Sequence, residues 1–185
     1  MTYYRSNLPQ WCPNGAPLFL TGRLHGSLPT IFFDRSGKAG SFTPGEVFRR
    51  ADEQLDRAAA GPLWLKDPRV AASVVEKIAR GDNELHHYSL HAYFVMSNHV
   101  HVLLTPNIPL RRVTDSLKGV TARTANQILR RSGQHFWQDE SCDHWCRNAA
   151  EFERIRGYVA RNPVSASLVA KPEDWPWSSA SDVRR

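Results

Sequence analysis

Cysteine is scarce in this chain, and its three residues, Cys12, Cys142 and Cys146, form an odd number. A framework of paired disulfides is therefore not expected, and this usage favours a reducing compartment. No apolar run approaches the ~18 residues that a membrane-spanning helix needs. The first residues, MTYYRSNLPQW, contain no apolar segment typical of a signal peptide. We therefore expect a cytoplasmic protein.

No repeat, low-complexity tract or long linker interrupts the 185 residues. A chain of this length can build one domain with its own hydrophobic core. We expect a single domain over residues 1–185, with a core of about 16–165 and a C-terminal extension of about 166–185.

Acidic residues are fewer than basic ones. The chain has 24 Lys and Arg but only 18 Asp and Glu, which gives a formal net charge of +6. Such an excess favours a polyanionic partner, although many proteins of this charge bind no nucleic acid. The excess is concentrated in two stretches of the C-terminal half, 111–131 and 147–161. The candidate nucleic-acid-binding residues there are Arg111, Arg112, Lys118, Arg123, Arg154, Arg156 and Arg161.

Hydrophobic periodicity and turn residues predict an alternation of strands and helices. The expected elements are a strand within 16–27, helices over about 43–60 and 68–80, strands over 88–96 and 99–105, a helix from 110 that Gly133 stops, a short strand at 141–146, and a helix over 149–161 that Pro163 terminates. The paired strands are apolar on both faces, which suggests the middle of a covered sheet. The order fits an α+β fold with a ferredoxin-like antiparallel sheet and helices packed on one face.

Two histidines stand one residue apart within the stretch FVMSNHVHVLLTP. Side chains alternate along a strand, so His99 and His101 share one face and Val100 takes the other. Imidazole is a common ligand of divalent transition metals, so the pair is a candidate metal site. Two satisfied histidines at a sheet surface are the other interpretation, and the pair by itself leaves both open.

The last predicted helix, AAEFERIRGYVARNP, carries a second polar group. Its apolar stripe is predicted to comprise Phe152, Ile155 and Val159. Asn162 falls within this stripe, and Tyr158 lies at its edge one turn earlier. A phenol and an amide therefore leave the same side of the helix, and they approach the histidines if that side faces the sheet. Tyr158 taken alone could instead be a packing aromatic.

The motif MSNHVHVLL resembles the His–hydrophobic–His signature of the IS200-like single-tyrosine transposases. The later segments LKGVTARTAN, FWQDESCDHW, YVARNPVSASLV and PEDWPWSSA resemble the REP-associated tyrosine transposases of that group, so the resemblance spans roughly 16–181. It implies that Tyr158 is the catalytic nucleophile, on a C-terminal helix, and that His99 and His101, on a central strand, bind a divalent metal together with Asn162. Other members carry Gln at the position of Asn162, and Pro is common where Ser97 stands.

The resemblance also implies a reaction. Members nick and rejoin single-stranded DNA at hairpins with a flanking guide tetranucleotide, in DNA transposition. A metal, Mg²⁺ or Mn²⁺, would act as a Lewis acid on the phosphodiester, and two imidazoles with an amide suit Mn²⁺ better. A phenol is mostly protonated at neutral pH and needs nearby positive charge to attack phosphorus, leaving a 5′-phosphotyrosine and a free 3′-hydroxyl.

Other interpretations stay open at this point. A hairpin-binding protein that has lost catalysis is one, and a replication initiator or relaxase with the histidine motif is another, although those usually carry larger chains and a third histidine. Both a monomer and a homodimer are compatible with the sequence. Trp175 and Trp177 could stack on bases, but a clamp on the core is the favoured interpretation.

Overall fold

A computed structural model describes residues 15–27, 53–57, 61–139 and 142–182, without the side chains of Cys142, Asp143 and Asp182. Of the helix expected over 43–60, residues 53–57 are helical, and the remainder lies outside the described residues. Cys12 lies outside them too. None of the described helices is long and apolar enough to cross a membrane.

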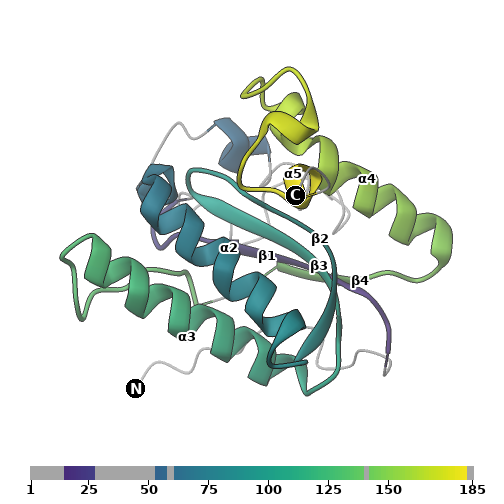
Figure 1. The fold of residues 1–185 in the computed structure, drawn as a ribbon, viewed down its shortest axis with the longest axis horizontal. Coiled ribbons are helices and arrows are strands. Elements are labelled where there is room, and N and C mark those ends of the chain that lie inside the picture. Colours follow the sequence, from purple (N-terminus) through teal and green to yellow (C-terminus); the bar gives the residue numbers. More distant parts are fainter. Residues whose placement is uncertain (1–14, 28–52, 58–60, 140–141, 183–185) are drawn as a thin grey trace, which may run out of the picture.

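Four antiparallel strands form the central sheet (Figure 1). They are β1 (Leu18–Arg23), β2 (Tyr88–Val95), β3 (His99–Pro106) and β4 (Cys142–Trp145), in the spatial order β2-β3-β1-β4. Each of the three neighbouring pairs is antiparallel. This is the ferredoxin-like arrangement that the order of elements predicts, and it makes β3 an inner strand.

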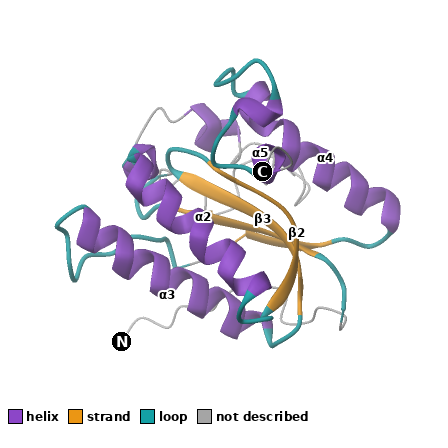
Figure 2. Cartoon of the chain, in the orientation of Figure 1, coloured by secondary structure: helices purple, strands orange, loops and turns teal. Residues whose placement is uncertain are grey.

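Helices cover both faces of this sheet (Figure 2). On one face α2 (Pro68–Asn83) packs beside α3 (Leu110–Ile128), and on the other lies α4 (Ala149–Ser165). We expected all helices to pack on one face of the sheet. This is correct for α2 and α3 but wrong for α4, which covers the opposite face. The physical reason is the apolar character of both faces of β2 and β3, since each face needs its own cover against water.

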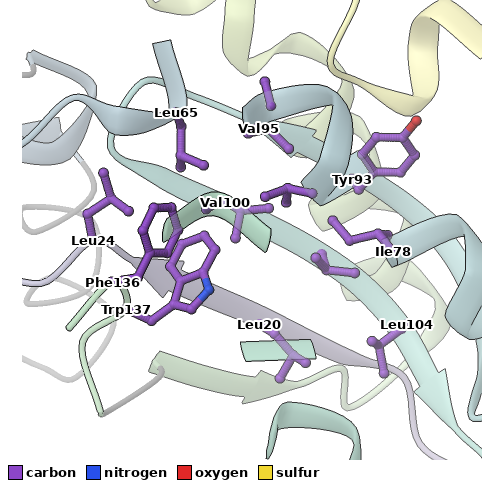
Figure 3. Close-up of a cluster of buried hydrophobic side chains, with 14 of the residues drawn as sticks. Leu20, Leu24, Leu65, Ile78, Tyr93, Val95, Val100, Leu104, Phe136 and Trp137 are labelled. Atoms are coloured by element: carbon purple, nitrogen blue, oxygen red, sulfur yellow. The ribbon is translucent and has the colours of Figure 1, made fainter. Parts of the chain in front are cut away.

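The larger core lies between the sheet and the helix pair α2 and α3 (Figure 3). Alternate β3 residues, Val100, Val102 and Leu104, face it, as does Ile78 of α2. A smaller apolar cluster under α4 contains the opposite side of the same strands, with Phe19, Phe94 and Leu103. Each fully buried side chain of this kind contributes about 1.5–3 kcal/mol.

Two helix ends differ from the sequence expectation. The helix α3 ends at Ile128, before Gly133, because Arg130 adopts a left-handed φ of 55° and Arg131 N–H donates to the Asn126 carbonyl at 2.7 Å. This is a Schellman-type end formed without glycine. The helix α4 continues through Pro163, since only one N–H is lost there and Ala166 N–H still donates to the Asn162 carbonyl at 2.9 Å.

The C-terminal segment lies along the outer edge of β2. Trp175 Nε1 donates to the Val95 carbonyl at 3.0 Å, and Val95 N–H donates to the Trp177 carbonyl at 2.8 Å. This segment contains two short helices, the 3₁₀ helix η3 (Pro172–Asp174) before the tryptophans and α5 (Ser179–Asp182) after them. The tryptophans thus clamp the core, as expected, and the segment covers an edge strand that would otherwise expose its N–H and C=O groups.

Candidate active site

His99 and His101 project from β3 onto the face that α4 covers, and both are fully buried. Their ring centroids are 4.8 Å apart, with the ring planes at 77°. Strand alternation places both rings on this face, as the sequence predicts. Phe94 of β2 contacts both rings from the neighbouring strand.

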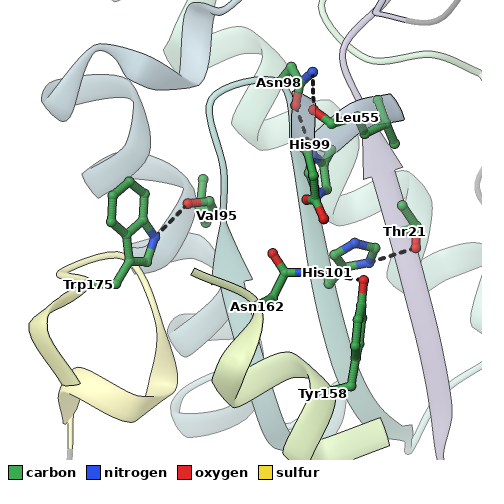
Figure 4. Close-up of polar contacts among 10 residues, drawn as sticks. Thr21, Leu55, Val95, Asn98, His99, His101, Tyr158, Asn162 and Trp175 are labelled. Carbon is green, nitrogen blue, oxygen red and sulfur yellow. Dashed lines mark hydrogen bonds and ion pairs between the residues drawn. The ribbon is translucent and has the colours of Figure 1, made fainter. Parts of the chain in front are cut away.

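Each histidine is held through its Nδ1 atom (Figure 4). The Oδ1 atom of Asn98 lies 2.8 Å from His99 Nδ1, and Asn98 Nδ2 donates to the Leu55 carbonyl at 2.9 Å. The Oγ1 atom of Thr21 lies 2.8 Å from His101 Nδ1. Partners of this kind fix the orientation of imidazoles that bind metals in proteins.

Sequence reasoning missed both of these supporting residues. The position of Asn98 directly before His99 is the sequence signal that points to it. Thr21 is brought to His101 by the pairing of β1 with β3, in which these two residues are direct partners. That pairing depends on the register of strands about eighty residues apart in the chain, so the sequence pattern holds no comparable signal for it.

Tyr158 and Asn162 extend from α4 toward the histidines (Figure 4). The ring of Tyr158 lies 6.2 Å from that of His101, and Asn162 Nδ2 donates to the Tyr158 hydroxyl at 2.9 Å. Phe19 packs against both rings. Its ring stacks on that of His101 with 4.9 Å between ring centroids and meets that of Tyr158 edge-on with 6.2 Å between centroids. The fold of a single chain therefore brings the four predicted site residues together. They are His99, His101, Tyr158 and Asn162.

The donor set fits a divalent ion. Asn162 Oδ1 is buried and has no hydrogen-bond partner within the described part of the chain, although a buried amide oxygen normally accepts one. The described residues contain no cluster of three His, Cys, Asp or Glu side chains arranged to bind a metal, and an amide oxygen would be a further donor beside the two imidazoles. Imidazole nitrogen and amide oxygen are ligands that Mn²⁺ accepts.

Comparison with known proteins identifies the family of this chain. Residues 66–162, just over half of the chain, match the family model described as transposase IS200 like. The chain belongs to the IS200-like transposase family. No curated protein matches the chain in sequence. Among solved structures, the chain is similar to a REP-associated tyrosine transposase bound to a REP hairpin, with a TM-score of 0.58, 18% identity, and coverage of 100% of this chain and 87% of that one.

Three of the basic residues predicted to bind DNA lie on α4, the helix that also carries Tyr158. The predicted DNA-binding residues Arg154, Arg156 and Arg161 are all exposed. Arg154 lies 3.3 Å from Glu151, and Arg156 lies 2.6 Å from Glu153. The Arg156–Glu153 pair is exposed on both sides, and pairs of this type contribute little to stability.

The other predicted DNA-binding residues lie on α3, across the sheet from the histidines. Arg111, Arg112 and Arg123 are exposed there. The ammonium of Lys118 instead donates to the backbone carbonyls of Gln138 and Asp139, at 2.9 Å each, and so ties α3 to the loop before β4. The structure therefore separates the candidate DNA contacts into two groups on opposite faces.

A polar network fastens the start of α4 to β4. Glu151 accepts a hydrogen bond from the Arg147 N–H at 2.8 Å and lies 2.9 Å from His144 Nε2, while the N-cap Asn148 accepts from the Glu151 N–H. The Arg147 N–H, and after it His144, lower the pKa of Glu151 below its ordinary value of 4.5. This network positions the helix that presents Tyr158 and Asn162.

Proposed function

We propose that this transposase is a metal-dependent enzyme that nicks and rejoins single-stranded DNA at hairpins through a 5′-phosphotyrosine. The observation that carries the proposal is the convergence of Tyr158 and Asn162 with His99 and His101. The similarity to a REP-associated tyrosine transposase solved with a REP hairpin supports REP-like hairpins as the substrate. The flanking guide tetranucleotide is what the resemblance of the sequence motifs implies.

Three side chains would hold the divalent ion, Mn²⁺ or Mg²⁺. His99 and His101 offer Nε2, because their Nδ1 atoms already face Asn98 and Thr21. Asn162 offers Oδ1, because its Nδ2 is committed to Tyr158. When bound, the ion supplies a Lewis acid for a non-bridging oxygen of the scissile phosphate.

Tyr158 performs the covalent step. Its hydroxyl oxygen attacks phosphorus in line, so that the Oη–P bond forms while the bond from phosphorus to the 3′-oxygen breaks. The phenol proton goes to solvent, and the leaving 3′-oxygen takes up a proton. Asn162 Nδ2 holds the attacking oxygen and stabilises negative charge on it. A 3′-hydroxyl from another strand end can then reverse the step and rejoin the DNA.

A direct test incubates the protein with a labelled DNA hairpin and Mn²⁺, and looks for a nick together with a covalent protein–DNA adduct. We expect peptide mapping to place the adduct on Tyr158. Tight hairpin binding with no nick and no adduct would instead identify a DNA-binding protein without catalysis. An adduct on another tyrosine would contradict the proposed nucleophile.

A further inference from the structure

Asp56 approaches the candidate metal site from a part of the chain that the sequence motifs do not include. It lies in the helical residues 53–57, and its Oδ1 is 3.6 Å from Nε2 of His99. The His99 side chain is fully buried, and that of Asp56 is 22% exposed. The preceding residue, Leu55, provides the carbonyl that holds Asn98. One helical turn therefore supports the amide on one side of His99 and places a carboxylate on the other.

Hydrogen bonding defines what His99 presents to this carboxylate. Asn98 donates through Nδ2 to the Leu55 carbonyl, so its oxygen faces His99 and accepts the proton on Nδ1. A neutral imidazole with its proton on Nδ1 carries a lone pair on Nε2. In this neutral form the lone pair faces the Asp56 oxygen, at a separation longer than a hydrogen bond. Two acceptors facing each other in a buried site are stabilised by a cation that contacts both.

We propose that Asp56 is the anionic donor of the metal site, which it joins from the His99 side. The inference rests on the proposed metal-dependent function. Two donor atoms that each lie about 2.1 Å from one ion are roughly 3–3.5 Å apart, which is close to the observed 3.6 Å. The described residues hold no preformed cluster of three His, Cys, Asp or Glu ligands, so the proposal requires the Asp56 carboxylate to shift toward the ion.

The carboxylate changes which ions the site prefers. Two imidazoles and an amide are all neutral, so they leave the full charge of a divalent ion uncompensated in a buried place. One carboxylate halves that charge and adds the type of oxygen ligand that Mg²⁺ and Mn²⁺ favour. Asp56 thus explains how a site with two histidines serves hard ions.

The test is calorimetric titration of the DNA-free full chain with Mn²⁺. We expect Asp56→Asn to weaken Mn²⁺ binding roughly 10- to 100-fold. The matched control is Glu53→Gln, which removes an exposed carboxylate one turn earlier in the same helical residues and should leave the affinity unchanged. If Asp56 merely pairs with a protonated His99, Asp56→Asn will bind Mn²⁺ as tightly as the wild type or more tightly, and the proposal is overturned.

A second measurement needs no substitution. The wild-type protein is labelled with ¹³C at the aspartate carboxyls, and bound Mn²⁺ is examined by electron–nuclear double resonance. We expect one coupled carboxyl carbon. The absence of coupling would overturn the proposal even if Asp56→Asn fails to fold. Nicking of hairpin DNA is assayed separately. If Asp56→Asn binds Mn²⁺ as tightly as the wild type while the wild type nicks DNA, only the role of Asp56 is overturned. If Asp56→Asn binds Mn²⁺ more weakly but the wild type does not nick DNA, Asp56 remains a metal ligand and the proposed function is overturned.

Discussion

The side-chain amide of Asn162 donates to the hydroxyl of Tyr158 across one turn of α4, with 2.9 Å between Nδ2 and Oη. The same amide therefore holds the proposed nucleophile with its nitrogen and leaves its buried oxygen for a metal. A spacing of four residues on one helix is what lets a single side chain serve both groups.

Replacing Tyr158 with Phe should abolish nicking and leave hairpin binding nearly intact, because only the nucleophilic oxygen is lost. Cleavage and gel-shift assays on one labelled hairpin measure both effects. The matched control is Tyr88→Phe, which removes a buried hydroxyl that donates to the Ile78 carbonyl at 2.7 Å. We expect that control to nick normally while losing about 1–3 kcal/mol of unfolding free energy. Nicking by Tyr158→Phe at the wild-type rate would eliminate the mechanism.

Loss of either histidine should remove most Mn²⁺ affinity and most nicking, because a site with so few protein ligands holds its ion poorly after losing one. Asn162→Ala should have a milder effect on metal binding, since water can replace a neutral amide oxygen. EDTA should stop the wild type, and Mn²⁺ should restore it at lower concentration than Mg²⁺. Calorimetry checks the affinities, with the exposed His135→Ala as a control. Unchanged affinity in a His99→Ala, His101→Ala double variant would contradict the site.

The hydroxyl of Thr21 should strengthen Mn²⁺ binding by orienting the His101 ring. Thr21→Val keeps the shape of the side chain but removes the contact to His101 Nδ1, so we expect Mn²⁺ affinity to fall roughly 10- to 100-fold. Thr105→Val is the matched control, since it removes a similar contact, 2.7 Å long, to His91. Equal Mn²⁺ affinity in the two variants would show that Thr21 has no part in orienting the ligand.

Stability should depend on pH through Glu151. Its pKa is lowered in the folded protein, chiefly by the Arg147 N–H and then by His144, so the folded state favours the carboxylate. The resulting stabilisation is complete above pH 4.5 and is lost as the pH falls through the lower folded pKa. In urea unfolding at several pH values, Glu151→Gln should flatten this dependence. Glu153→Gln, an exposed neighbour on the same helix, should retain it.

Binding of single-stranded DNA should weaken with salt, with a slope of log K against log salt near −3 to −4 if about 5 phosphates are neutralised. We expect charge reversal of Arg154 and Arg161 to weaken binding more than reversal of Arg111 and Arg112, because the first pair lies on the helix that carries Tyr158. Fluorescence anisotropy at several salt concentrations measures both. A slope near zero would mean that the positive charge serves only solubility.

The structure departs from the sequence-based expectations at the ends of two helices and in the face of the sheet that α4 covers. Pro163 is a strong stop signal, yet α4 continues past it because the cost of one missing hydrogen bond falls in its last turn. Gly133 has the positive φ expected of a helix stop, but Arg130 ends α3 first. The apolar residues on both faces of β2 and β3 already indicated a covered sheet, although not that α4 would provide the second cover.

The sequence by itself determined the local geometry of the site. Alternation along a strand places His99 and His101 on one face, and helical periodicity places Tyr158 and Asn162 on one side, because both repeats follow from backbone geometry within a few residues. Only the tertiary structure decided that these two faces meet, that Thr21 and Asp56 lie beside the histidines, and that the basic residues divide between opposite faces. Those relationships depend on strand register and on the packing of segments far apart in the chain, which no local pattern encodes.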